Sequence, residues 1–190
     1  MNKIIESIIC TYENILSDKI CNNIIEKFKI DEHVYNKFDK NSNISILKIR
    51  YSPDPIWGEI DSIICKIINE YSNIYNKHIR ETNLHFSFSY NYNDNGYFIY
   101  KFNKNIGFHN VDNPFTWNKK NGFAIASFIF FLNTIENGAE IEFFNIKNIK
   151  PEKGNLIIFP ATWDLVYKHN IPISSDNYII TGTLYYNYNK

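Results

Sequence analysis

Hydrophobic residues recur at helical spacing in two segments of the N-terminal half, and this pattern predicts two amphipathic helices. The first helix would begin after Ser17, a candidate N-cap, and its apolar positions are Ile20, Ile24, Ile25 and Phe28. The second follows a break at Pro53 and Pro55, and its apolar positions are Ile56, Ile60, Ile63, Ile64, Ile67, Ile68, Tyr71 and Tyr75. A short alternating strand at residues 44–50 lies between them. We therefore expect a helical portion from about residue 12 to about residue 80.

From Phe86 onward the hydrophobic period changes to two, which is typical of strands. Aromatic residues alternate with Ser and Asn from Phe86 to Asn93, and the Asn95-Gly96 pair then predicts a tight hairpin turn. Further strands are predicted at residues 97–102, 124–132, 140–144, 156–159 and 178–188. Helices followed by strands, with no helix between the strands, predict an α+β fold with a sandwich or rolled-up sheet. The barrel strands would occupy about residues 84–190 of a single domain that spans residues 1–190.

Composition narrows the class of protein. A chain of 190 residues with 44% hydrophobic residues is long enough for one domain with a sizeable core. Twenty basic and twenty acidic residues cancel without any run of like charge, so we expect no nucleic-acid partner. No apolar run approaches membrane-spanning length, and we expect no membrane partner. Cys10, Cys21 and Cys65 lack metal or disulfide spacing, which favours reduced thiols in an intracellular, cytoplasmic protein.

Two polar residues stand out in the strand region, Asp112 in the segment NVDNP and His169 in a strand-turn-strand frame. With the segments around them they resemble the iron(II) and 2-oxoglutarate dependent oxygenases of the prolyl-hydroxylase type. The segments that carry the resemblance, in order, are YENILSDKICNNIIEKF at 12–28, VDNP at 111–114, FLN at 131–133, GAEIEFF at 138–144, PEKGNLIIFP at 151–160 and His169. The resemblance covers nearly the whole chain. It implies a double-stranded β-helix, a jelly-roll or cupin-like barrel, with the N-terminal helices packed on its outside.

The resemblance also implies two cofactors, Fe(II) and 2-oxoglutarate, and a hydroxylated peptide or small-molecule substrate. Such sites hold iron with two histidines and one carboxylate and leave three positions open. Asp112 and His169 match the carboxylate and the second histidine. The first histidine is expected two residues before Asp112, where this chain has Asn110, and His109 is displaced by one residue. Neighbouring strand residues point to opposite faces, so His109 would need a bulge or loop to reach the metal, and either residue remains a candidate ligand.

Two co-substrate positions also depart from the family pattern. Asn177 stands where a lysine or arginine would bind the distal carboxylate of 2-oxoglutarate, and Phe102 stands where some relatives have a tyrosine. An amide cannot supply a charge-assisted contact to a carboxylate. The candidate replacements for this cation are Lys119, Lys120 and Lys168. Trp117 and Trp163 are candidates for a substrate groove.

These departures leave three interpretations open. The first is an active oxygenase that hydroxylates its substrate and releases succinate and carbon dioxide. The second is a catalytically inactive relative that keeps the barrel as a binding or scaffolding module. The third is a cupin-like or lectin-like β-sandwich that binds a sugar through its Tyr, Trp and Asn side chains.

Overall fold

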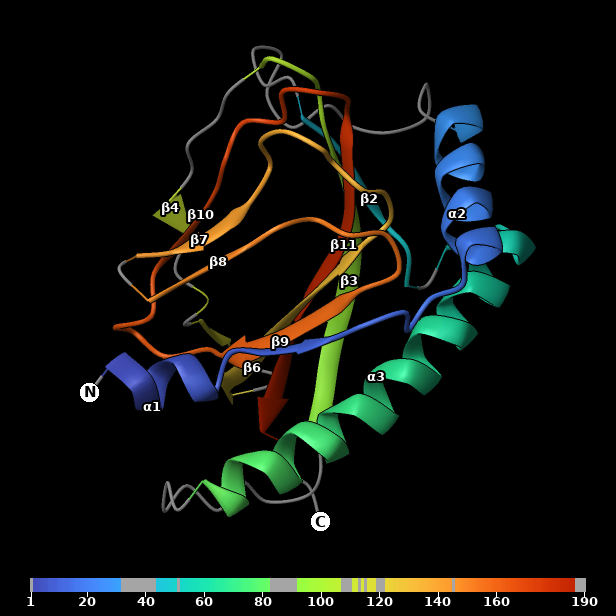
Figure 1. Ribbon diagram of the computed structural model, residues 1–190. Coiled ribbons are helices and arrows are strands. Elements are labelled where there is room, and N and C mark those ends of the chain that lie inside the picture. Colours follow the sequence, from blue (N-terminus) through green and yellow to red (C-terminus); the bar gives the residue numbers. More distant parts are fainter. Residues whose placement is uncertain are drawn as a thin grey trace.

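The computed structural model describes residues 2–31, 44–50, 52–82, 92–106, 111–112, 114, 116–118, 122–144 and 146–186. Two antiparallel sheets face each other, and the long helices cover the outer face of the larger sheet (Figure 1). The helices are α1 (Asn2–Ser7), α2 (Asp18–Asp31) and α3 (Pro55–Glu81). The strands are β1 (Cys10–Tyr12), β2 (Ile44–Lys48), β3 (Tyr92–Phe102), β4 (Val111–Asp112), β5 (Trp117–Asn118), β6 (Gly122–Phe131), β7 (Ile141–Phe143), β8 (Lys147–Ile149), β9 (Leu156–Pro160), β10 (Tyr167–His169) and β11 (Asn177–Tyr186).

The larger sheet has the order β1-β9-β6-β11-β3-β2, with β5 paired to β6, and the smaller sheet has the order β4-β10-β7-β8. All the paired strands are antiparallel. The predicted α+β class, with helices on the outside of a folded sheet, is therefore confirmed. Within the described residues, no helix is both long and apolar enough to cross a membrane.

Local sequence signals set the ends of the two long helices. The Ser17 hydroxyl accepts a hydrogen bond from the backbone N–H of Ile20 at 3.4 Å, at the start of α2. Asp54 caps α3 by accepting from the N–H of Ile56 at 2.8 Å, and Pro55 occupies the first turn, where no intrahelical N–H is needed. Both predicted helices are confirmed, and α3 continues beyond Tyr75 to Glu81.

The large sheet buries side chains on both of its faces, which gives the protein two cores. The helix-side core lies between this sheet and the helices, and its sheet members include Tyr97, Ile99, Phe128, Phe130, Leu156, Ile158, Tyr178, Ile180 and Leu184. The inter-sheet core lies between the two sheets and contains Ile9, Ile129, Phe131, Ile141, Phe143, Ile149, Ile157, Phe159, Leu165, Tyr167 and Ile179. Consecutive residues of one strand enter different cores, because side chains alternate across a sheet.

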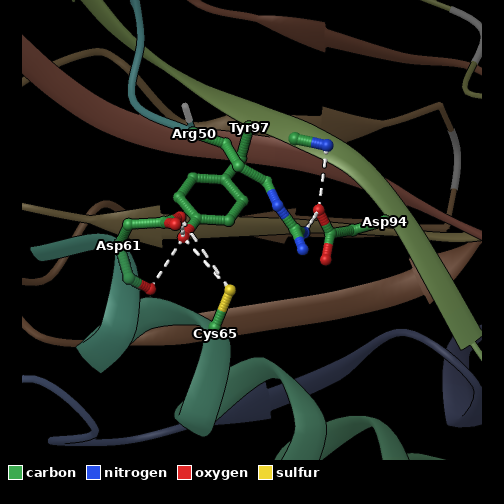
Figure 2. A network of polar contacts seen from close by, with 6 residues as sticks. Arg50, Asp61, Cys65, Asp94 and Tyr97 are labelled. Carbon is green, nitrogen blue, oxygen red and sulfur yellow. Dashed lines mark hydrogen bonds and ion pairs between the residues drawn. The ribbon is translucent and has the colours of Figure 1, made fainter. Parts of the chain in front are cut away.

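Tyr97 joins α3 to the sheet through a polar contact inside the helix-side core (Figure 2). Its hydroxyl donates to the backbone carbonyl of Asp61 at 2.9 Å and also contacts the Asp61 carboxylate, and it lies 3.6 Å from the sulfur of Cys65. Burial and the hydrogen bond to Asp61 raise the pKa of Tyr97 well above its ordinary value. The Tyr97 hydroxyl therefore stays protonated and fixes α3 against β3.

One predicted turn is wrong. Asn95-Gly96 does not end a strand, because β3 runs without interruption from Tyr92 to Phe102. The register of β3 against β11 shifts here, since Gly182 pairs with Tyr97 whereas Leu184 pairs with Asp94. One extra residue on β3 is thus accommodated as a bulge, and Gly96 takes the positive φ of 87° that it requires. Most of the strand predicted from Phe86 lies outside the described residues.

Gly138, which precedes β7, pairs with the segment that follows β10. It forms a bridge with Pro172 at a φ of 81°, and the next residue, Ala139, donates its N–H to the carbonyl of Ile171 at 3.0 Å. A Cβ atom at Gly138 would lie 2.1 Å from that same carbonyl oxygen. Only glycine fits this position without moving the chain that follows His169.

We expect Gly138→Ala to lower the free energy of unfolding by about 2 kcal/mol or more, because both the φ angle and the Ile171 carbonyl oppose a side chain. Urea unfolding followed by circular dichroism measures the change. The matched control is Gly58→Ala in the first turns of α3, where a Cβ meets nothing within 4 Å. That control should be neutral or stabilise by up to about 1 kcal/mol. Equal unfolding midpoints for the two variants would contradict this account.

Candidate functional site

His169 lies at the end of β10, inside the space between the two sheets. Its strand pairs with β7 in a register that places His169 opposite Ile141, and its neighbour on the same face, Tyr167, opposite Phe143. The His169 side chain is buried, with 7% of its surface exposed. Burial lowers the pKa of His169 to about 4, because the charged imidazolium loses its hydration. The side chain is therefore a neutral imidazole at physiological pH.

Phe102 and His169 come from opposite sheets and stack on each other. Their ring centroids are 5.1 Å apart and their planes differ by 20°. Tyr100 stacks on Phe102 at 6.0 Å, and Tyr167 meets His169 edge-on at 5.5 Å. The stack covers a face of the imidazole, whereas a metal would approach a ring nitrogen in the plane of the ring. Stacking thus fixes the orientation of the ring without occupying the direction in which it would bind a metal.

Asn177 is the register partner of Phe102, so it lies beside the same stack. It is 2% exposed, and its neighbour two residues on, Ile179, belongs to the inter-sheet core. Within the part of the chain that the structure describes, the carboxamide oxygen of Asn177 is buried and accepts no hydrogen bond. An unsatisfied buried acceptor destabilises a protein by about 1–3 kcal/mol, so this atom is unusual in a folded core.

Asn133 fixes the backbone on both sides of Asn177. Its side-chain nitrogen donates to the carbonyl of Asp176 at 2.8 Å, and its side-chain oxygen accepts from the N–H of Tyr178 at 2.9 Å. Asn133 lies in the FLN segment, but no sequence pattern assigns it this role. A single amide therefore sets the position from which the Asn177 side chain extends.

The backbone of Asp112 reaches the same region through β4. Asp112 pairs with Tyr167 and Val111 pairs with Lys168, which places position 112 next to the strand that carries His169. The other two candidate ligands, His109 and Asn110, lie outside the described residues. Among the side chains that the structure does describe, no three of the His, Cys, Asp and Glu type gather to hold a metal.

The lysines near these strands face away from His169 and Asn177. Lys168 follows Tyr167 on the other face of β10 and pairs with Glu142 at 2.9 Å. Lys101 precedes Phe102 on the other face of β3 and lies 3.7 Å from Asp176. Lys168 is therefore not the substitute cation that the sequence left open, and Lys119 and Lys120 lie outside the described residues.

The two candidate groove tryptophans are exposed, at 59% for Trp117 and 75% for Trp163. Trp117 pairs across β5 and β6 with Phe123, which is 49% exposed. This pairing occurs at the start of β6, whereas Phe131, at the other end of that strand, pairs with Ile179 near Asn177. The tryptophans thus belong to the opposite end of the strands from Asn177.

The sequence predicted His169, Phe102 and Asn177 as site residues, and the structure brings all three together. The sequence did not identify Tyr100 and Tyr167, which complete the aromatic stack. The alternation of Tyr100 with Phe102, and of Tyr167 with His169, was the available signal, because residues two apart on a strand share a face. That signal does not show which strands of opposite sheets will meet.

Several solved prolyl hydroxylases share this arrangement of sheets and helices. A collagen prolyl hydroxylase of Paramecium bursaria Chlorella virus-1, in complex with 2-oxoglutarate, aligns with a TM-score of 0.66 and 14% identity over 93% of this chain and 94% of its own. A Pseudomonas putida prolyl-4-hydroxylase aligns with a TM-score of 0.65 and 11% identity over 98% of this chain and 100% of its own. No protein-family model and no curated protein matches the sequence.

A third structure is a Trichoplax adhaerens prolyl hydroxylase in complex with a peptide fragment of the hypoxia inducible factor oxygen degradation domain. It aligns with a TM-score of 0.65 and 11% identity over 97% of this chain and 89% of its own. At these identities the similarity shows the fold. The predicted double-stranded β-helix is confirmed.

Burial of His169 should make the metal-free protein sensitive to acid. The unfolded chain binds a proton at this residue below about pH 6.5, whereas the folded protein resists protonation until about pH 4. The free energy of unfolding should therefore fall as the pH falls from 6.5 to 4, by up to about 3 kcal/mol from this group. Urea unfolding in the presence of a chelator measures this dependence.

His169→Phe keeps an aromatic ring in the core but cannot be protonated, so its unfolding free energy should depend less on pH over this interval. Phe102→Leu is the matched control, since it removes the stacked ring and leaves the buried imidazole. It should be less stable than the wild type at every pH but keep the wild-type slope. An unchanged slope in His169→Phe would show that another group causes the acid sensitivity.

Proposed function

We propose that the protein is an iron(II)-dependent oxygenase that uses a 2-oxo acid to hydroxylate a peptide or small-molecule substrate. The single observation that carries this proposal is the pairing of Asp112 with Tyr167, two residues from the buried His169. Paired positions of an antiparallel ladder share a face of the sheet, and so do residues two apart on one strand. Position 112 and His169 thus lie on the same face. The fold shared with prolyl hydroxylases supports the same assignment.

His169 and Asp112 would supply two ligands for the iron, and His109 or Asn110 the third. The neutral imidazole of His169 suits this role because a metal ligand must be deprotonated. Two histidines with one carboxylate would leave three positions open for the 2-oxo acid and dioxygen. When bound, iron(II) would allow dioxygen to add one oxygen atom to a substrate C–H bond and the other to the 2-oxo acid, which loses carbon dioxide.

The remaining residues of the site would orient the His169 ring and exclude water. Phe102 holds the imidazole plane in place, and Tyr167 covers its edge. The barrel walls around them are apolar, so they keep water away from the reacting groups. Among these neighbours, the Trichoplax enzyme carries a bound peptide. We propose a peptide, or a small molecule of similar shape, as the substrate class.

The residues around Asn177 do not fit the distal carboxylate of 2-oxoglutarate. Asn177 is uncharged, Phe102 has no hydroxyl, and Lys101 and Lys168 form ion pairs on the other faces of their strands. Charge-assisted hydrogen bonds contribute about 1.5–3 kcal/mol each. The loss of these hydrogen bonds should lower the affinity for 2-oxoglutarate by about one to two orders of magnitude.

His169→Ala should weaken iron(II) binding by about 100-fold or more, because it removes one of only three protein ligands. Anaerobic calorimetry with iron(II), or with manganese(II) as a stable substitute, measures the affinity. The control is His78→Ala on α3, whose ring contacts the carbonyl of Ser7 outside the barrel. Wild-type affinity in His169→Ala would contradict the proposed site.

The same titration separates the two candidates for the third ligand. Imidazole binds iron(II) better than an amide does, so His109→Ala should weaken binding more than Asn110→Ala. The opposite order would assign the ligand to Asn110.

A second candidate function is a non-catalytic binding or scaffolding module in the same fold. The uncharged Asn177 favours it, since the co-substrate position lacks its cation. In this case the wild type should bind neither iron(II) nor 2-oxoglutarate. If these positions have been assigned correctly, the double variant Asn110→His with Asn177→Lys should bind both iron(II) and 2-oxoglutarate, as measured by calorimetry. Micromolar binding of both ligands by the wild type would exclude the second candidate.

A further inference from the structure

The wall of the barrel beside His169 carries one buried hydrogen-bond acceptor with no donor. Asn177 is 2% exposed, and its carboxamide oxygen accepts no hydrogen bond from the described part of the chain. Phe102, its register partner, stacks on the His169 ring at 5.1 Å. Asn177 and the imidazole of His169 are therefore both neighbours of Phe102, one by strand pairing and the other by ring stacking. A molecule bound next to His169 would lie within reach of both.

Hydrogen bonds fix the backbone segment that carries this acceptor. Asn133 holds the backbone of Asp176 and Tyr178 on either side of it, at 2.8 and 2.9 Å. The carboxylate of Asp176 accepts from the backbone N–H of Lys104 at 2.8 Å, which fixes the same segment to the end of β3. The backbone that carries the Asn177 side chain is thus held in place before any ligand binds. Such preorganised polar groups determine which ligands a site accepts.

The residues around Asn177 disfavour a negatively charged group on a ligand. Of the residues whose burial is described, the fully buried polar ones are Ser45, Ser72, Asn76, Ser127, Asn155, His169 and Asn177, and none of them is Lys or Arg. Lys101, the cation nearest to Asn177 along the paired strands, lies on the other face of β3 beside Asp176. A carboxylate placed beside Asn177 would lose its hydration and meet only a neutral amide, with no cation to stabilise its charge. A ligand N–H or O–H would instead complete the missing hydrogen bond.

We propose that the site beside His169 and Asn177 takes a 2-oxo acid whose far end is uncharged and carries a hydrogen-bond donor, such as a carboxamide or a hydroxyl, in preference to 2-oxoglutarate. The proposal rests on the proposed function, which places a metal at His169 to bind the 2-oxo acid end. The far end then meets Asn177, and its donor satisfies the carboxamide oxygen. The apolar rings of Phe102 and its neighbours pack along the chain between the two ends.

The test compares two unreactive analogues that differ only at the far end. N-oxalylglycine imitates 2-oxoglutarate and ends in a carboxylate, whereas N-oxalylglycinamide ends in a carboxamide. Both are titrated by calorimetry into the full-length protein loaded with manganese(II), after manganese binding has been measured by itself. We expect the amide to bind at least about 10-fold more tightly than the carboxylate, because the carboxylate loses its hydration without meeting a cation, whereas the amide can donate to Asn177.

Two variants show whether Asn177 is responsible for this preference. Asn177→Lys supplies the missing cation and should reverse the order of the two analogues. Asn177→Leu removes the acceptor, keeps a side chain of similar size, and should bring the two affinities within about threefold of each other. Manganese affinity serves as the folding control, because both variants should retain it.

The possible results distinguish failure of this inference from failure of the proposed function. Manganese binding with tighter binding of N-oxalylglycine, or with no binding of either analogue, would overturn this inference and leave the metal site in place. An amide preference that persists in Asn177→Leu would also overturn it. Failure of the wild type to bind manganese at all would overturn the proposed function, and the inference with it.

Discussion

The large sheet has to bury both of its faces, and this constraint determines which residues of the protein carry information about function. Its outer face packs against α2 and α3 and its inner face against the smaller sheet, so polar side chains at the centre of either face are shielded from water. A buried polar group without a partner destabilises the fold. Most interior positions are accordingly Ile, Leu, Phe or Tyr. His169 and Asn177 are exceptions on the inner side, and they lie beside the same phenyl ring.

The site that results is uncharged where the structure describes it. Burial keeps the His169 imidazole neutral, Asn177 is an uncharged amide, and the lysines of β3 and β10 form ion pairs on the other side of their strands. A neutral imidazole is the form that binds metals. A neutral amide, by contrast, offers no counter-charge to a dicarboxylate. The two ends of the proposed site therefore differ: the imidazole is in the form that a metal requires, whereas the amide lacks the charge that a dicarboxylate requires.

The fold by itself does not decide the activity, because one architecture can host several functions. Similarity to prolyl hydroxylases at 11–14% identity shows the double-stranded β-helix. The specific residues on the inner face then have to carry the functional argument. Here those residues are a buried neutral imidazole and an uncharged amide, and the oxygenase proposed above depends on both.

The sequence by itself determined the helices, the main strands and most of the residues that meet in the site. Periods of 3.6 and two residues reflect which faces are buried, and the caps at Ser17 and Asp54 are local interactions, so no tertiary information was needed. The tertiary structure decided the rest. Gly96 became a bulge in place of a turn because β3 pairs with β11 on both sides of it. The stacking of Phe102 on His169 and the unsatisfied oxygen of Asn177 depend on contacts between strands far apart in the chain, and local patterns contain no information about which of those strands will meet.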